Sequence, residues 1–131
     1  MILVDTSIWV SLFSKKPKIS LTESGLVQIL TTPPVIQEVL QGIHNDLAHR
    51  KLKEQLFAFP SAGENISLEL YLEAGEIYRL GRTKGFTIRS SIDCLIAAIA
   101  MRADVPIWHL DRDFEQIAKF TALKTDRRIT L

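Results

Sequence analysis

The sequence predicts an α/β sandwich in which helices pack against a mainly parallel sheet. Two observations support this fold class. Short apolar runs that favour strands alternate along the chain with longer segments whose apolar residues recur with the spacing of one helix face. The run at residues 1–5 is apolar up to its terminal acid and does not alternate with polar residues, which is typical of a strand buried on both faces.

Size and composition limit the organisation of the chain. The 131 residues suffice for one domain with a single core. Because there is no internal repeat, low-complexity tract or linker, we expect one domain over 1–131. The N-terminus lacks the basic region of a signal peptide, and no apolar stretch is long enough to span a membrane. We therefore expect a cytoplasmic protein.

Charge and cysteine usage exclude several classes of function. A net charge of +1 requires neither nucleic acid nor membrane as a partner, so any basic surface must be local. A single cysteine, Cys94, excludes an internal disulfide and a cysteine-based metal site. Cys94 lies in an apolar segment, so we expect a buried and inert thiol.

The N-terminal part begins with a strand at 1–5 and a helix at 6–13, whose two opening hydroxyl residues can act as N-caps. Lysines and a proline at 14–20 end this helix. A second strand is expected at 25–32, although a helical interpretation from Ser20 onward stays open.

The middle of the chain is expected to be helical. The segment 33–42 begins with two prolines and ends at a glycine, as helices often do. An amphipathic helix over 44–59 and a loop at 60–65 follow. The pattern then predicts a helix over 67–85 and a strongly apolar, buried helix over 89–102.

The C-terminal part returns to strands. The run at 105–110 predicts a short strand, which is followed by a helix over 113–120. One last short strand is expected within 121–131. Strands and helices thus alternate to the end of the chain.

Acidic residues are expected at the junctions between these elements. Asp5 ends the first strand, and Asp111 follows a later strand with Asp113 two residues beyond it. Asp93 lies in the first turn of the buried helix, and Glu38 lies on the flank of an apolar helix stripe. Crevices in open α/β sheets form outside the carboxyl ends of the strands, and helix amino ends point to the same rim. We therefore expect these carboxylates to gather there.

Each acid alone also has an ordinary structural explanation. Asp5 can cap the helix that follows it, and Glu38 can lie on a solvated helix flank. Ser90 and Asp93 fit a capping motif, and one of the two later aspartates can cap the next helix. Together, however, the acids predict crowded like charges, which are costly unless a cation lies between them. Carboxylate oxygens suit Mg²⁺ or Mn²⁺ rather than zinc, and no histidine or cysteine cluster competes.

Four segments carry a family resemblance: ILVDTSIWV, VIQEVLQG, SIDCLIAAIA and IWHLDRDFEQIA. Taken together and in this order, they resemble the PIN-domain ribonucleases, and most of all the VapC toxins of type II toxin–antitoxin systems. The resemblance covers nearly the whole chain, although residues 15–32 match poorly and His109 stands where the family often has threonine. It implies a Rossmann-like three-layer α/β/α sandwich and an endoribonuclease that uses Mg²⁺ or Mn²⁺.

The resemblance also implies roles for individual residues and partners. The implied catalytic acids are Asp5, Glu38, Asp93, Asp111 and Asp113, and the first four of them are the implied metal ligands. Whether Asp111 and Asp113 complete the shell of one ion, or bind a second ion or the attacking water, stays open. Thr6 or Ser7 resembles the hydroxyl residue that supports such a site. The implied partners are an RNA substrate, with tRNA and rRNA as candidate classes, a VapB-like antitoxin whose tail blocks the acids, and a second copy of the chain in a homodimer.

Two further groups are candidates for contacts with RNA or with a protein partner. Basic residues before the buried helix and after the first helix can contact phosphates, or can be ordinary solvated charges. They are Arg79, Arg82, Lys84 and Arg89, together with Lys15, Lys16 and Lys18. The aromatic residues Trp9 and Phe13 belong either to the core or to a groove for a partner helix.

Other classes of protein fit the sequence less well. A two-component receiver domain needs paired acids early in the chain and an aspartate that ends a middle strand, and neither is found. A haloacid-dehalogenase phosphatase needs the motif D-x-D-x-T, and DTSIW lacks the second aspartate. A PIN-like module that binds RNA or protein without cleaving it stays the main alternative, because a fold does not by itself imply an activity.

Overall fold

The central sheet has four strands, all parallel, in the order β2-β1-β3-β4. We describe it from a computed structural model that covers residues 1–131. The strands are short: β1 (Ile2–Val4), β2 (Ile29–Leu30), β3 (Ile107–Trp108) and β4 (Thr125–Asp126). The chain moves from β1 to β2 on one side and then returns to β3 on the other side of β1.

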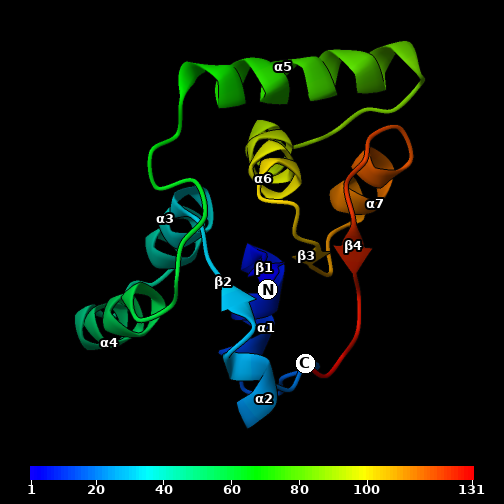
Figure 1. The fold of residues 1–131 in the computed structure, drawn as a ribbon. Helices are drawn as coiled ribbons and strands as arrows, with labels where there is room; N and C mark the ends of the chain where they lie inside the picture. The colour runs from blue at the N-terminus through cyan, green and yellow to red at the C-terminus, as the bar shows by residue number, and fades with distance from the viewer.

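Seven helices surround the sheet, so the predicted α/β sandwich with a parallel sheet is confirmed. Figure 1 shows α5, α6 and α7 on one side of it and α1 and α2 on the other, with α3 and α4 beyond the β2 edge. None of these helices is both long and apolar enough to cross a membrane. The helices are α1 (Thr6–Leu12), α2 (Glu23–Leu26), α3 (Pro33–Gln41), α4 (Asp46–Phe57), α5 (Leu68–Thr83), α6 (Ser91–Arg102) and α7 (Arg112–Ala118).

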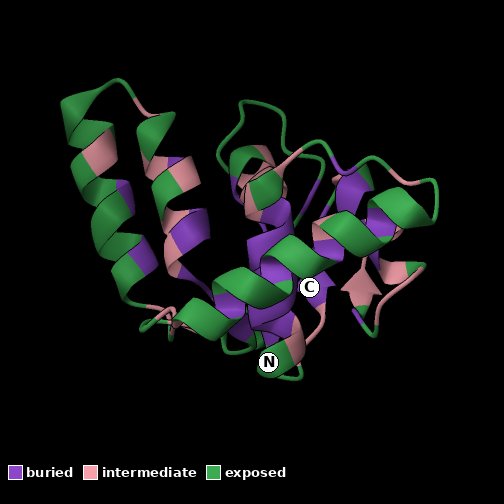
Figure 2. Ribbon diagram, turned by 90° about the horizontal axis from the view of Figure 1, so that it is seen from above, coloured by how far each residue is buried: buried purple, intermediate pink, exposed green.

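The core forms around β1, β3 and α6. The three residues of β1 are at most 3% exposed, as expected for a strand covered on both faces. Leu3 pairs with Ile107 and Val4 pairs with Trp108, which brings the carboxyl ends of β1 and β3 to the same level. Figure 2 shows α5 crossing above α6, with the buried residues gathered beneath it.

Helix α6 is buried along most of its length. Every residue from Asp93 to Ala100 is buried, because the helix lies between the sheet and α5. Its start is fixed by Ser90, whose side chain accepts a hydrogen bond from the backbone N–H of Asp93. Cys94 is buried, as predicted, and burial raises the pKa of its thiol to about 11. It is therefore unsuited to act as a nucleophile.

The turn between α5 and α6 depends on Gly85. Gly85 has φ +84°, a conformation that side chains with a Cβ rarely adopt. The N–H of Phe86 donates to the carbonyl of Gly81, and the N–H of Gly85 donates to that of Arg82, which is the Schellman pattern. The predicted end of this helix near Gly85 is confirmed, and the turn carries the chain to Arg89 and the start of α6.

Two sequence-based boundaries are wrong. The strand expected over 25–32 contains only Ile29–Leu30, because the short helix α2 precedes it. Thr22 caps α2 and also donates its backbone N–H to the carbonyl of Leu131, so the far end of the chain fixes this segment. The strand expected over 105–110 is limited to the two residues of β3. The last short strand expected within 121–131 is confirmed as β4, and Thr130 forms only an isolated bridge with Ser20.

Candidate metal centre at the carboxyl ends of the strands

The sheet topology brings two acids to one rim. The order of the strands reverses between β1 and β3, and ligands of open α/β sheets bind beside such a point. Asp5 follows β1 directly, and its backbone N–H donates to the carbonyl of Trp108 over 3.0 Å. Asp111 follows β3 after a short connection and caps α7. Asp5 and Asp111 therefore face the same crevice from adjacent strands.

Asp5 serves as a helix cap and as a site residue at the same time. Its Oδ2 accepts hydrogen bonds from the backbone N–H and the hydroxyl of Ser7, over 3.0 and 2.5 Å. The Ser7 hydroxyl also accepts from the backbone N–H of Leu110, so it joins the ends of β1 and β3. Asp5 is only 3% exposed, and burial raises its pKa against the opposing hydrogen bonds from Ser7.

Glu38 approaches the crevice from α3. Its Oε1 accepts a hydrogen bond from the Thr6 hydroxyl over 3.1 Å, and the residue is half-buried. Glu38 therefore does not lie on a fully solvated flank. Burial raises the pKa of Glu38, and the hydrogen bond from Thr6 opposes this shift. The negative charge of Asp5 raises the pKa of Glu38 further. The two hydroxyl residues after β1 thus support different acids: Thr6 donates to Glu38, and Ser7 donates to Asp5.

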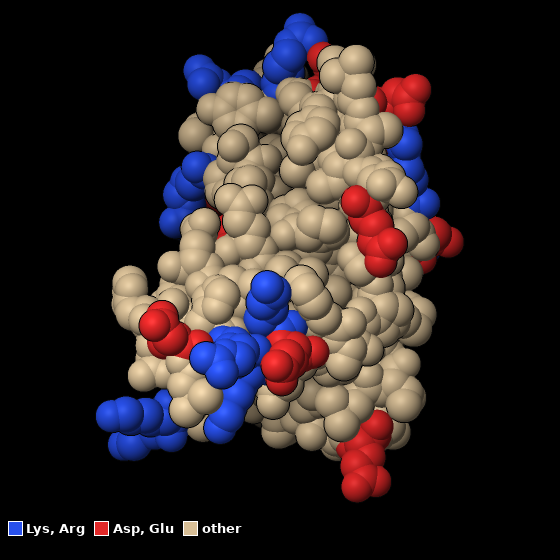
Figure 3. Space-filling model, turned by 90° about the vertical axis from the view of Figure 1, so that its left-hand side faces the viewer, with Lys and Arg blue, Asp and Glu red and all other residues tan.

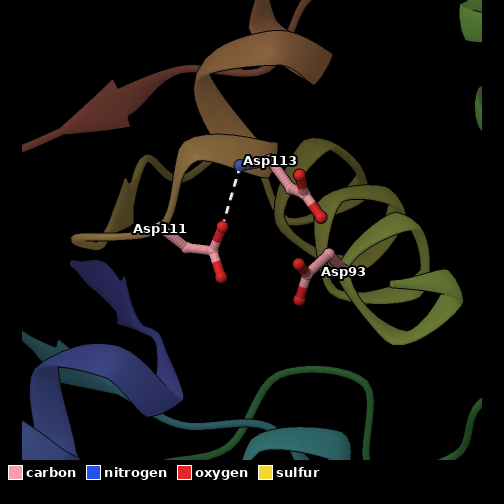
Figure 4. A group of neighbouring side chains, drawn as sticks. All are labelled: Asp93, Asp111 and Asp113. Carbon is pink, nitrogen blue, oxygen red and sulfur yellow. Dashed lines mark hydrogen bonds between the residues drawn. The ribbon is translucent and has the colours of Figure 1, made fainter. Parts of the chain in front are cut away.

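The other three acids meet between α6 and α7. Figure 4 shows Asp93 and Asp111 pointing into one space, with Asp113 above them. One carboxylate oxygen from each of the three can be chosen so that all lie within 4.8 Å of one another. Asp111 caps α7 by accepting from the backbone N–H of Asp113 over 2.8 Å, so the predicted cap is Asp111.

The charge at this rim is unbalanced around Asp93. Asp93 is 6% exposed, and its carboxylate accepts no hydrogen bond that would stabilise its charge. Burial, followed by the negative charges of Asp5 and Asp111, raises the pKa of Asp93 to about 8. Glu38 and Asp113 raise the pKa further, so the charges of four acids act on the fifth, Asp93. A set of oxygen donors with excess negative charge suits a hard divalent cation.

Comparison with known proteins identifies the family. The PIN domain family matches residues 2–120. Ribonuclease VapC11 of Mycobacterium tuberculosis is 37% identical over 130 residues, which cover 95% of this chain and 96% of the relative. The chain is a PIN domain of the VapC family. A VapC ribonuclease of Mycobacterium bovis matches it with the same identity and coverage.

Solved structures agree with this PIN fold. VapBC-1 from nontypeable Haemophilus influenzae matches with a TM-score of 0.72 at 19% identity, covering 96% of this chain and 97% of the other. VapBC2 from Rickettsia felis, bound to a DNA fragment from its promoter, matches with a TM-score of 0.70 at 19% identity, covering 96% and 98%. At this identity the likeness concerns the fold, and it confirms the PIN-like architecture expected from the sequence motifs.

The basic residues expected to contact RNA are in different settings within this PIN domain. Arg79 pairs with Glu76 on the exposed side of α5. Arg82 and Lys84 are exposed at the end of α5. Arg89 instead lies at the acids, where it pairs with Asp111 and Asp113. The exposed lysines after α1 are Lys15, Lys16 and Lys18. An RNA contact stays a prediction for each of these residues.

The aromatic pair on α1 divides between core and surface. Trp9 is 4% exposed and packs against Phe59 with ring centroids 5.6 Å apart. Phe13 is 46% exposed and stacks on Trp9. An apolar groove that also includes Leu26 and Leu12 runs past both rings. Trp9 therefore belongs to the core and Phe13 to the surface, and a partner contact stays a prediction for Phe13.

The structure also shows a pair that the sequence did not suggest. His109 is fully buried beside Phe114, and its Nε2 lies 2.9 Å from a carboxylate oxygen of Glu115 on α7. The other ring nitrogen has no hydrogen-bond partner. Histidine and glutamate six positions apart across a strand–helix junction form no recognisable motif. The pair joins the segment after β3 to α7.

Proposed function

We propose that this PIN domain is a VapC-type endoribonuclease that depends on Mg²⁺ or Mn²⁺ and acts as the toxin of a toxin–antitoxin pair. The observation that supports this most directly is the gathering of five carboxylates at one rim, in a chain 37% identical to ribonuclease VapC11. We also infer that residues 1–131 form one domain, because the buried apolar residues form one continuous cluster. An RNA substrate implies action in the cytoplasm.

The acids have complementary roles in this proposal. Asp5, Glu38, Asp93 and Asp111 would hold the cation, and the family resemblance adds Asp113 to the catalytic set. A bound divalent cation lowers the pKa of its water and offsets charge on the phosphoryl group. The chain itself supplies orientation. Ser7 holds the Asp5 carboxylate at the end of β1, and Thr6 holds that of Glu38. The proton favoured on Asp93 at neutral pH must leave when a cation enters.

The test of this activity is hydrolysis of RNA by the purified chain. We expect cleavage of tRNA or rRNA with Mn²⁺ or Mg²⁺, none with EDTA, and products that end in a 5′-phosphate and a 3′-hydroxyl. Single-stranded or looped regions are the expected targets, because their bases are accessible. Metal-dependent binding of RNA without new ends would instead favour the module that binds without cleaving.

A protein partner is the second part of the proposal. The solved relatives are VapBC structures, which supports a VapB-like antitoxin as the partner. The groove beside Phe13 and Leu26 is the proposed site for an apolar helix of that partner. Figure 3 shows the side on which α3 and α4 lie, where charged side chains gather in clusters and a band between these clusters lacks them. Such uncharged surface is consistent with partner contacts, and we propose a homodimer as the toxin's own assembly.

Expression in a bacterial host tests the toxin role. We expect the wild-type chain to arrest growth when it is expressed alone and Asp5→Asn to permit growth, because the substitution removes one acid of the cluster. A matched control is Asp46→Asn, which changes an exposed aspartate in the first turn of α4 and should still arrest growth. Immunoblots of the soluble fraction must show equal amounts. Normal growth with soluble wild-type protein would contradict the toxin role.

The basic end of α5 gives a separate prediction about RNA. The double change Arg82→Glu and Lys84→Glu should weaken RNA binding and leave Mn²⁺ affinity unchanged. Each lost phosphate contact removes counterion release, so the slope of log affinity against log salt should become shallower by roughly one per contact. The measurement is an RNA titration at several salt concentrations.

The matched control for this change lies on α4. Arg50→Glu with Lys51→Glu alters the net charge equally at two exposed positions of α4, far from the end of α5 (Figure 1). If Arg82 and Lys84 only complement the α5 helix dipole, the salt slope will not change and the protein will melt slightly earlier.

A further inference from the structure

Asp113 differs from the other acids in how its carboxylate is bound. Its side chain is 3% exposed, and both of its oxygens already accept hydrogen bonds from one residue. The backbone N–H of Arg89 donates to Oδ2 over 3.0 Å, and the guanidinium Nε of Arg89 donates to Oδ1 over 3.3 Å. Asp93 accepts no comparable bond, so its oxygens are free for a ligand.

The two bonds of Asp113 connect the segment before α6 with the first turn of α7. Arg89 directly precedes Ser90, the N-cap of α6, and Asp93 lies in the first turn of that helix. On the other side, the backbone N–H of Asp113 is the group that Asp111 caps. The Arg89–Asp113 pair therefore sets where the first turn of α6 lies relative to the first turn of α7, and with it the gap between Asp93 and Asp111.

Arg89 also adds positive charge where the acids are most crowded. Its Nη2 lies 3.5 Å from Oδ1 of Asp111, while 61% of its side chain is exposed. One guanidinium thus bridges two carboxylates of the cluster and offsets part of their repulsion. The charge of Asp113 is balanced within the protein, whereas that of Asp93 is not.

We propose that Arg89 and Asp113 form a positioning pair that holds Asp93 and Asp111 at the separation a shared cation requires, and that Asp113 is not itself a metal ligand. This inference rests on the proposed metal site. It divides the acids into metal ligands and one positioning residue, Asp113. Arg89 is then primarily a support of the site, although its exposed edge can still face RNA.

The sign of the change in melting temperature distinguishes a positioning residue from a metal ligand. Removing the charge of a ligand relieves repulsion in the metal-free protein, so its melting temperature should rise. Removing the charge of the positioning residue Asp113 leaves Arg89 without its buried partner, so the melting temperature should fall by several degrees. We therefore expect Asp113→Asn and Arg89→Gln each to melt lower than wild type in EDTA. The double variant should melt no lower than the worse single one, because the two residues form one contact.

Mn²⁺ titration calorimetry on the same proteins supplies the second readout. We expect Asp111→Asn to lower Mn²⁺ affinity more than tenfold, and Asp113→Asn to lower it by less than tenfold. In the Arg89→Gln background, Asp113→Asn should cause no further loss of Mn²⁺ affinity. If Asp113 were a metal ligand, Asp113→Asn would lower the Mn²⁺ affinity in both backgrounds. Lys124→Gln is the matched control, because its ion pair with Asp104 is exposed at both ends and should matter little.

The outcomes separate this inference from the function it rests on. A wild type that binds no Mn²⁺ would overturn the proposed metal site and the positioning role together. A wild type that binds Mn²⁺, with Asp113→Asn melting higher than wild type or losing equal affinity in both backgrounds, would overturn the positioning pair alone. If Asp113→Asn does not fold, Arg89→Gln decides, and unchanged melting and affinity would refute the pair.

Discussion

Asp93→Asn is expected to stabilise the metal-free protein at alkaline pH and to remove its response to Mn²⁺. The reason is the raised pKa of Asp93, which burial and the neighbouring acids bring to about 8 from an ordinary value of 3.8. At pH 8.5 the wild-type protein must keep a buried, unpartnered carboxylate charged. Asparagine has nearly the same shape without the charge, and its amide can donate to the neighbouring carboxylates.

The pH dependence of stability follows from the same shift. Between pH 3.8 and about 8, folded Asp93 keeps a proton that the unfolded chain releases. Its contribution to stability is therefore fully present below 3.8 and is lost as the pH rises through about 8. Wild-type protein in EDTA should lose about 2 kcal/mol or more of its free energy of unfolding between pH 5.5 and 8.5. Asp93→Asn should not lose this part.

Thermal or urea unfolding across this pH range, with and without Mn²⁺, measures both effects. Mn²⁺ should stabilise wild type more at pH 8 than at pH 6, because binding must displace the proton from Asp93. Asp46→Asn, on the surface of α4, controls for the general effect of removing an acid. Equal pH profiles or equal Mn²⁺ responses for wild type and Asp93→Asn would show that Asp93 is not part of a cation site.

The sequence predicted those features that depend on local patterns and general topology. An apolar run followed by two hydroxyl residues defined β1 and α1, and a long apolar segment after Ser90 defined α6. The rule that parallel strands open onto one rim was enough to bring Asp5 and Asp111 together. Asp93 could be added because the amino end of a helix points toward the same rim.

Features that depend on distant contacts could not be predicted in this way. Helix α2 is held by a bond from Thr22 to the carbonyl of Leu131, so no local window contains its cause. Arg89 resembles the other basic residues before α6, but its partner Asp113 lies 24 positions further on. The burial of His109 beside Glu115 likewise follows from packing of α7 on β3. The sequence thus indicated which acids lie close together, but not that Arg89 pairs with one of them.

Asp5→Asn is expected to lower ribonuclease activity by more than roughly a hundredfold while the protein stays folded. Asp5 combines two roles that a substitution can separate, because it caps α1 and also contributes a carboxylate to the rim. Asparagine is as good an N-cap as aspartate, so the bond from the N–H of Ser7 can persist. Only the charge is lost, and with it the affinity of the crevice for a cation.

Asp5→Ala removes the cap and the charge together. It should lose activity to the same extent and should also lose about 1 kcal/mol of stability relative to Asp5→Asn, because the backbone N–H of Ser7 then lacks its acceptor. The comparison requires RNA cleavage rates with Mn²⁺ and urea unfolding in EDTA for both variants. If Asp5→Asn keeps wild-type activity while Asp5→Ala unfolds, Asp5 is a helix cap and the cation site must be assigned to the remaining acids.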